Sequence, residues 1–218
     1  MLEIGERLFM KNYSKKISDR LQLISQQMGE KTAICCNGTD CTYGEFIELI
    51  NKISEEIHRK GIKKDSLIMI KTKRSPFMVA SMFAAILNDC AFQLIDINNN
   101  IKRNNYMMKV TRAGCIIESE NDSFKIHKIE AETFTYPGIA YVIFTSGSTG
   151  KPRGVMISSE ALYNTVNSAP VFLYLNCNDV VLAASSVLFD IFILETFVSL
   201  CCGCKVVLAT DDEYNNPR

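Results

Sequence analysis

The sequence predicts an α/β protein with a mostly parallel sheet and helices on both of its faces. Short apolar runs, such as 66–71 and 139–144, alternate with segments whose apolar residues recur at helical spacing. Parallel strands need crossover helices and are buried on both faces, so continuous apolar runs are typical of them. The chain has 218 residues, of which 47% are apolar and 22% are charged, enough for a large core and unlike collagen-like or disordered sequences.

The elements follow one another in a regular order. Thr42-Tyr-Gly-Glu45 is a capping box, and apolar residues then recur at helical spacing until Gly61. Ser75-Pro76 opens a second helix through Leu87, because proline is tolerated in the first turn. Strands are predicted at 66–71, 91–97, 115–118, 139–144, 154–157, 180–183 and 205–209, and further helices at 102–111, 161–167 and 191–200. The polar stretch 119–137 is predicted as a loop, and 210–218 as a polar tail without a closing element.

Charge and cysteine content narrow the function classes. Lys and Arg number 24, as do Asp and Glu, so the formal net charge is 0 and neither nucleic acid nor a membrane surface is an expected partner. The first residues lack the profile of a signal peptide, which favours a cytoplasmic location. The nine cysteines are therefore predicted to be small buried thiols.

The apolar stretch 180–209 is predicted as a buried strand-helix-strand unit and not as a membrane span. Asp190, Glu195 and Lys205 interrupt it, and an acidic residue at the centre of a span costs about 2.5 to 3.5 kcal/mol. An unpaired carboxylate among apolar residues is also costly, so Asp190 is expected to have a cationic or hydrogen-bonding partner. Glu195 is expected to cap or pair locally.

The segment from Thr145 to Gly154, TSGSTGKPRG, has the composition of an anion-binding loop. Its glycines let backbone N–H groups curve around oxygens, its hydroxyls add donors, and Lys151 supplies a positive charge, which together suit a polyphosphate. The G-x-x-x-x-G-K-[ST] pattern of nucleotide triphosphatases fails, because Thr145 and Pro152 stand where Gly and Ser or Thr are required.

YVIFTSGSTGKPRGV, from Tyr141 to Val155, resembles the phosphate-loop signature of the adenylate-forming superfamily, which includes the amino-acid adenylation domains of nonribosomal peptide synthetases. The capping box and its helix are similar to the "LTY-x-E-L" segment of that family, and 86–97 (ILNDCAFQLIDI) is similar to "LKAG-AYVPID". Phe189-Asp190 with Glu195 resembles "FD-x-S-x-x-E". The resemblance covers about residues 30 to 209.

The sequence also departs from the family pattern. Cys90 and Gln93 replace the expected Gly and Val, Phe192 replaces Ser, and Ser159 stands where many members have His. By the resemblance, residues 1–209 correspond to the N-terminal subdomains. Members of the family are longer, and the regions that supply the magnesium ligand, the adenine and ribose contacts and the lysine of the mobile C-terminal domain are expected to be absent.

The resemblance implies a reaction and a set of site residues. ATP and a carboxylate give an acyl-adenylate and pyrophosphate, and the thiol of a phosphopantetheinyl carrier protein then attacks the adenylate. The β- and γ-phosphates of ATP would be held by Thr145, Ser146, Gly147, Ser148, Thr149, Gly150 and Lys151. Asp190 would bind the α-ammonium of an amino-acid substrate, and Ile191 and Leu194 would face the substrate pocket. Mg²⁺ would bridge the phosphates in the complete enzyme, with no ligand for it named in this chain.

Three interpretations stay open. The chain is a fragment or split half of an amino-acid-activating ligase that needs its C-terminal half, or a noncatalytic nucleotide-binding remnant, or part of an acyl-CoA-type ligase in which Asp190 has no ammonium to bind. Asp190 is alternatively a structural N-cap of the helix that begins at Ile191, because Asp is a preferred capping residue.

Overall fold

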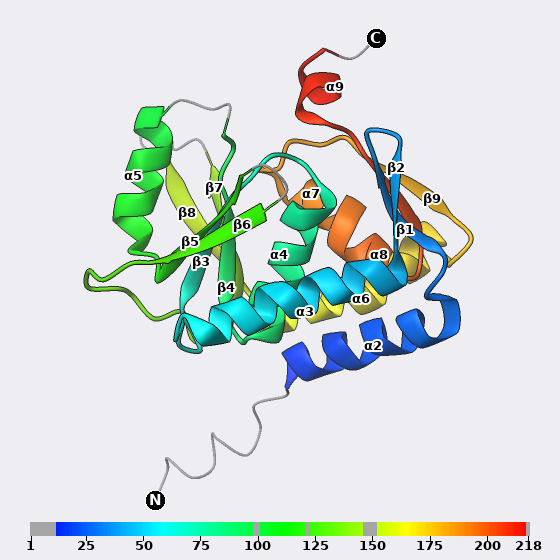
Figure 1. The fold of residues 1–218 in the computed structure, drawn as a ribbon, viewed down its shortest axis with the longest axis horizontal. Helices are drawn as coiled ribbons and strands as arrows, with labels where there is room; N and C mark the ends of the chain where they lie inside the picture. The colour runs from blue at the N-terminus through cyan, green and yellow to red at the C-terminus, as the bar shows by residue number, and fades with distance from the viewer. Residues whose placement is uncertain (1–11, 98–100, 121–122, 146–151, 217–218) are drawn as a thin grey trace, which may run out of the picture.

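The structure is a computed structural model, which describes residues 12–97, 101–120, 123–145 and 152–216 (Figure 1). One sheet contains β3 (Leu67–Lys71), β4 (Ala91–Leu94), β5 (Cys115–Glu120), β6 (Ser123–Lys128), β7 (Ile139–Thr145) and β8 (Arg153–Ser158). The other contains β1 (Thr32–Cys36), β2 (Thr39–Thr42), β9 (Val180–Ala183) and β10 (Lys205–Leu208). The helices are α2 (Tyr13–Met28), α3 (Tyr43–Arg59), α4 (Pro76–Leu87), α5 (Ile101–Thr111), α6 (Ser159–Leu173), α7 (Asp190–Ile193), the π-helix η1 (Leu194–Val198), α8 (Ser199–Cys201) and α9 (Asp211–Asn215).

Both sheets have a parallel interior. The six-stranded sheet runs β6-β5-β3-β4-β7-β8, with antiparallel partners only at its two edges. The four-stranded sheet runs β2-β1-β10-β9, and only the β1–β2 pair is antiparallel. The predicted α/β class with a mostly parallel sheet is confirmed, although the strands divide between two sheets.

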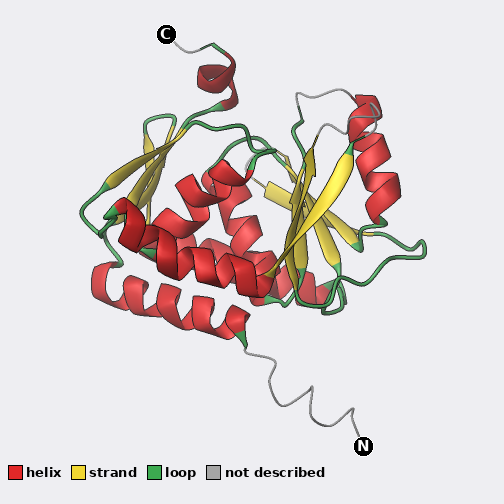
Figure 2. Cartoon of the chain, turned by 180° about the vertical axis from the view of Figure 1, so that it is seen from behind, coloured by secondary structure: helices red, strands yellow, loops and turns green. Residues whose placement is uncertain are grey.

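A layer of helices lies between the two sheets. Most of the long helices lie between the two groups of strands, and α5 lies beyond the six-stranded sheet (Figure 1, and from behind in Figure 2). Helix α4 packs against β3 and β4 on one side and β1 on the other, and every side chain from Met78 to Ile86 is buried. A helix that is apolar all round is one that is covered on all sides, so α4 forms the centre of the core.

The largest core cluster fills the space between the sheets. The rings of Phe83 in α4 and Phe197 in η1 are stacked with centroids 3.9 Å apart, and Phe46 of α3 meets Phe83 edge-on at 5.5 Å. A smaller cluster, which includes Met69, Met107 and Phe144, lies on the α5 side of the six-stranded sheet.

The capping box is confirmed. The Glu45 backbone N–H donates to Thr42 Oγ1 at 3.2 Å, and the Thr42 N–H donates to Glu45 Oε2 at 2.8 Å. Gly61, with φ of +64°, follows the end of α3 in the left-handed region that favours glycine. The nine cysteines are free, and burial raises the pKa of the Cys115 thiol to about 12. Within the described ranges no helix is long and apolar enough to cross a membrane.

Several elements differ from the sequence predictions. The predicted loop 119–137 contains β6, which pairs with β5 along its whole length. The polar tail carries α9, which begins at a second capping box between Thr210 and Glu213. The predicted helix 191–200 is divided by a π-helical turn into α7, η1 and α8. Residues 13–42, for which no element was predicted, form α2, β1 and β2.

Candidate functional site

The candidate phosphate loop connects β7 to β8 and follows the carboxyl end of β7. Strands β3, β4 and β7 are parallel, so their carboxyl ends lie along one side of the sheet, which we call its carboxyl edge. Ligands of open α/β sheets bind at this edge. Thr145 ends β7 and pairs with Arg153, which begins β8. The Thr145 side chain is exposed. The other residues assigned to the phosphates, 146–151, lie outside the described residues.

Arg103 lies beside the start of this loop. Its Nη2 donates to the carbonyl oxygen of Phe144 at 3.4 Å, and its Nε is buried without a partner among the described residues. The sequence prediction missed this cation, because a single arginine in an otherwise ordinary helix has no local signature. Its position adds positive charge at the residue that precedes the loop.

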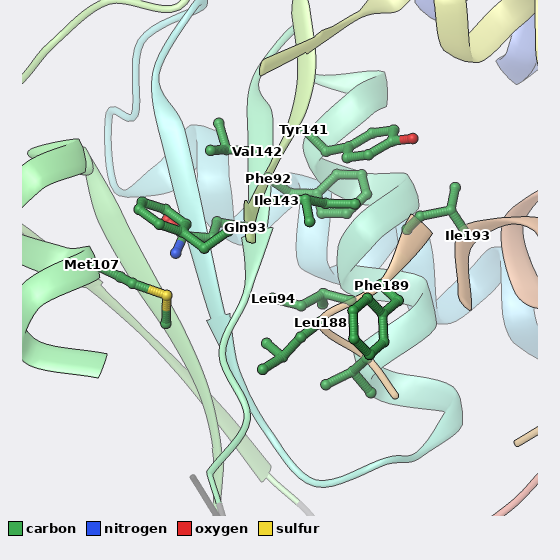
Figure 3. A pocket seen from close by; sticks show the side chains of 12 residues that line it. Phe92, Gln93, Leu94, Met107, Tyr141, Val142, Ile143, Leu188, Phe189 and Ile193 are labelled. Carbon is green, nitrogen blue, oxygen red and sulfur yellow. The ribbon is translucent and has the colours of Figure 1, made fainter. Parts of the chain in front are cut away.

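The segment 187–193 packs against the same end of the sheet. A narrow cleft is lined by Leu188 and Phe189 on one side and by Leu94 and Ile143 on the other (Figure 3). Val187 and Phe144 also line it. The cleft encloses about 10 Å³, which is room for about one water molecule. It is therefore too small for an amino-acid side chain, but it shows that the Phe189-Asp190 segment and the end of β7 are neighbours.

Asp190 is the first residue of α7, and its side chain is exposed. Phe189 is the N-cap residue, and α7 has no side-chain cap, so the alternative role of Asp190 as N-cap is wrong. Burial and, after it, the nearby Asp190 carboxylate raise the pKa of Tyr141 to about 12. Among the described residues none forms a hydrogen bond or ion pair with the Asp190 carboxylate, so the expected partner stays a prediction.

The other two substrate residues lie close to Asp190 in the chain. The Ile191 side chain is 54% exposed, whereas Leu194 is half-buried and packs against the large core. Neither contributes to the narrow cleft, and their assignment to a substrate pocket stays a prediction. Glu195 pairs locally, as expected: its Oε1 accepts from Ser185 Oγ at 2.5 Å and its Oε2 accepts from the Ser185 N–H at 3.0 Å.

A larger cavity lies among the described residues at the opposite end of the sheet. It holds about 430 Å³ and is lined by residues that precede or begin β3, β4 and β7, together with the first residues of α2 and α6. Because the candidate loop follows the carboxyl end of β7, this cavity is separate from the predicted site. Within the described ranges no group of three or more His, Cys, Asp or Glu side chains is placed to hold a metal ion.

Comparison with known proteins identifies the family. The profile of the AMP-binding enzyme family matches residues 21–137 and 136–218. The chain is 27% identical over 213 residues to the dimodular nonribosomal peptide synthase of Bacillus subtilis (strain 168), covering 87% of this chain and 9% of that protein. It is 30% identical over 213 residues to bacitracin synthase 3 of Bacillus licheniformis, covering 88% of this chain and 3% of that protein.

Solved structures show the same fold. The four-domain nonribosomal peptide synthetase holo-AB3403 matches with a TM-score of 0.78 at 20% identity, covering 93% of this chain and 16% of that one. The N-terminal subdomain of Klebsiella oxytoca NpsA matches with a TM-score of 0.73 at 19% identity, covering 87% of this chain and 52% of that one. The chain has the fold of the N-terminal part of an adenylation domain, spans a small share of the length of the synthetases it matches, and belongs to the AMP-binding enzyme family.

Proposed function

We propose that the chain forms the N-terminal part of an ATP-dependent amino-acid-activating ligase, the part that holds the ATP phosphates and the α-ammonium of the substrate. The observation that carries the proposal is the placement of two segments at one edge of the sheet. The phosphate loop leaves β7 at Thr145, and Phe189, which directly precedes Asp190, lines a cleft with Phe144. A polyphosphate on the loop and an ammonium at Asp190 are therefore neighbours.

The loop supplies the electrostatic part of the reaction. When a carboxylate attacks the α-phosphate of ATP, negative charge builds up on the departing pyrophosphate. Backbone N–H groups, the hydroxyls of the loop and Lys151 stabilise that charge, and preorganised donors lower such a barrier. Arg103, whose guanidinium donates to the Phe144 carbonyl, adds a fixed cation beside the start of the loop. Mg²⁺ would add positive charge at the phosphates, and no residue of this chain is assigned to hold it.

Asp190 supplies the recognition of the amino acid. Its carboxylate is exposed at the beginning of α7, so a substrate ammonium can reach it without displacing an internal partner. A charge-assisted hydrogen bond to an ammonium is worth about 1.5–3 kcal/mol. Ile191 and Leu194 would add apolar contacts. The structure of AB3403 holds AMP and glycine, which supports binding of an adenine nucleotide together with an amino acid here.

A further part of the proposal is that more polypeptide completes the site. The exposed apolar residues on the outer face of the four-stranded sheet support it. Val180 and Leu182 of β9 are 63% and 60% exposed, and Leu182 pairs with Val207, which pairs with Cys35. Parallel sheets are normally covered on both faces, yet within the described ranges the helices lie on the inner face only (Figure 1). We expect the rest of an adenylation domain, in the same chain or in a separate one, to cover this row and to present the adenylate to a carrier-protein thiol.

The phosphate-binding half of the proposal is tested by NMR titration of the chain with pyrophosphate and with ATP. The amides of Gly147–Gly150 are expected to shift first, at millimolar ligand, because the loop carries its own anion donors and phosphate contacts alone bind weakly. Lys151→Ala should abolish these shifts. Lys109→Ala, on the exposed side of α5, is the matched control and should leave them unchanged. Shifts elsewhere with unmoved loop amides would reject the phosphate site.

A further inference from the structure

Arg74 is a buried cation at the junction of the two sheets. It lies between β3 and α4, and it is 5% exposed. Its Nε donates to the Ala209 carbonyl at 2.9 Å, its Nη1 to the Ser185 carbonyl at 2.8 Å, and its Nη2 to the Ala183 carbonyl at 3.1 Å. One guanidinium, from the loop that follows β3 of the six-stranded sheet, thus joins the carboxyl ends of β9 and β10 in the other sheet.

The surroundings of Arg74 compensate its burial without a direct ion pair among the described residues. The guanidinium carbon lies 5.0 Å from the ring centroids of both Phe192 and Tyr214. Asp211 Oδ2 accepts from the Arg74 backbone N–H at 3.2 Å. Burial lowers the pKa of Arg74, and the carboxylates of Asp211 and Glu195 oppose that effect. A buried charge is costly unless its hydrogen bonds are satisfied, so this cation is held by carbonyl groups and two aromatic faces.

Ser185 forms hydrogen bonds to a cation, Arg74, and to an anion, Glu195. Its carbonyl accepts from Arg74, while its N–H and hydroxyl both donate to Glu195. A short turn follows, in which the Phe189 N–H donates to the Ser186 carbonyl at 3.1 Å. The backbone is therefore anchored five residues before Asp190 and turns directly into α7.

We propose that Arg74 is a positioning residue, which together with Glu195 fixes the segment 183–190 so that Asp190 stands at the carboxyl edge of the six-stranded sheet. This inference rests on the proposed function, in which Asp190 binds the substrate ammonium. Arg74 acts through the backbone and touches no substrate. A planar guanidinium with donors in a fixed fork can reach these three carbonyls in two separate segments, whereas lysine carries all its donors on one nitrogen atom.

Hydrogen exchange on the whole chain tests the positioning directly. Arg74→Lys and Arg74→Met are compared with wild type, with the amides of residues 185–190 as readout and those of β5 as reference. We expect exchange at 185–190 to become about ten to a hundred times faster, because hydrogen bonds to a charged donor are lost, while β5 changes less than about twofold. Added methylguanidinium should restore protection in an Arg74→Ala variant, whose shortened side chain leaves room for it, and methylammonium should not.

Arg112→Lys is the matched control. Arg112 also faces an aromatic ring, at 4.7 Å from the Phe134 centroid, and bonds Glu132 at 2.7 Å, but its side chain is 44% exposed. The Arg112→Lys variant should leave hydrogen exchange at 185–190 unchanged. If the Arg74 variants unfold the chain as a whole, Glu195→Leu decides, because it removes the acceptor of the Ser185 N–H and hydroxyl and should speed exchange at 185–190 alone. Wild-type exchange at 185–190 in Arg74→Lys, or in Glu195→Leu where the Arg74 variants unfold, overturns the proposal.

A second measurement separates positioning from structural support alone. In the chain fused to the rest of an adenylation domain, Arg74→Lys should raise the KM for the amino acid at least about tenfold and the KM for ATP less than about threefold. Equal changes in both constants, or an unchanged amino-acid KM beside loosened 185–190 amides, would overturn the positioning role. A wild-type fusion that binds ATP but activates no amino acid would instead refute the proposed function, whatever the exchange data show.

Discussion

Replacing Phe197 by alanine tests the packing that joins the two sheets. Phe197 is fully buried, and its ring stacks on Phe83 with an interplanar angle of 6°. Truncating a buried phenylalanine costs about 3–5 kcal/mol, of which the aromatic pair contributes about 0.5–1.5 kcal/mol. A domain is stable by about 5–15 kcal/mol in total. We therefore expect Phe197→Ala to remove a large fraction of the free energy of unfolding.

Urea denaturation followed by circular dichroism measures this loss. Phe172→Ala is the control, because Phe172 is 79% exposed on α6 and its truncation should change the free energy of unfolding by less than about 0.5 kcal/mol. A double-mutant cycle with Phe83→Ala should return a coupling energy of about 0.5–1.5 kcal/mol for the ring pair. A loss below about 1.5 kcal/mol for Phe197→Ala, with an unchanged denaturant slope, would refute the packing described between the sheets.

Two further predictions concern stability. Tyr43→Phe should lower the free energy of unfolding by about 1–3 kcal/mol in the same urea assay, because the buried hydroxyl lies 3.1 Å from the Leu200 carbonyl and 2.8 Å from the Cys204 carbonyl; Tyr174→Phe, at an exposed site, should be neutral. Burial raises the pKa of Cys90 to about 11 and of Cys115 to about 12, so the unfolded chain loses these thiol protons first as pH rises, and stability should fall from about pH 9 up to about pH 12. A Cys115→Ala variant should lose less stability over that range, and an equal fall in both proteins would contradict the assignment.

The parts of the fold that local sequence predicts are those with local causes. The capping box at Thr42 and the Pro76 start of α4 depend on residues a few positions apart, and both are found where the pattern places them. The strand 180–183 is found with the same bounds as predicted. In each case the signal lies in the residues of the element itself: a capping box, a proline in the first turn or a continuous apolar run.

Elements whose own residues carry no clear apolar pattern were missed. Strand β1 is short and cysteine-rich, and it is completed by pairing with β10, where Cys35 aligns with Val207. The division into two sheets was missed for a related reason, since it depends on the pairing of β1 with β10, which come from opposite ends of the chain. Strand β6 is polar, and its partner β5 supplies the ladder that holds it.

The candidate site shows the same division. The composition of a loop without apolar side chains indicates a chemistry by itself, so a phosphate-binding role can be predicted from the sequence alone. Arg74 is not, because its acceptors are backbone carbonyls, which leave no trace in residue identity. Asp190 was expected inside an apolar environment, but Phe189 and Ile191 on either side are 61% and 54% exposed, so the apolar run does not mark a buried segment there.

The recognition of an α-ammonium by Asp190 is tested most directly by ATP–pyrophosphate exchange in the chain fused to the rest of an adenylation domain. The wild-type fusion should activate an amino acid in preference to the matching des-amino acid. Asp190→Asn should weaken amino-acid activation about ten- to a hundredfold with an unchanged KM for ATP, since the neutral amide loses the charge-assisted bond. Full activation by Asp190→Asn, or a wild-type preference for the des-amino acid, would contradict the ammonium-binding role and favour an acyl ligase.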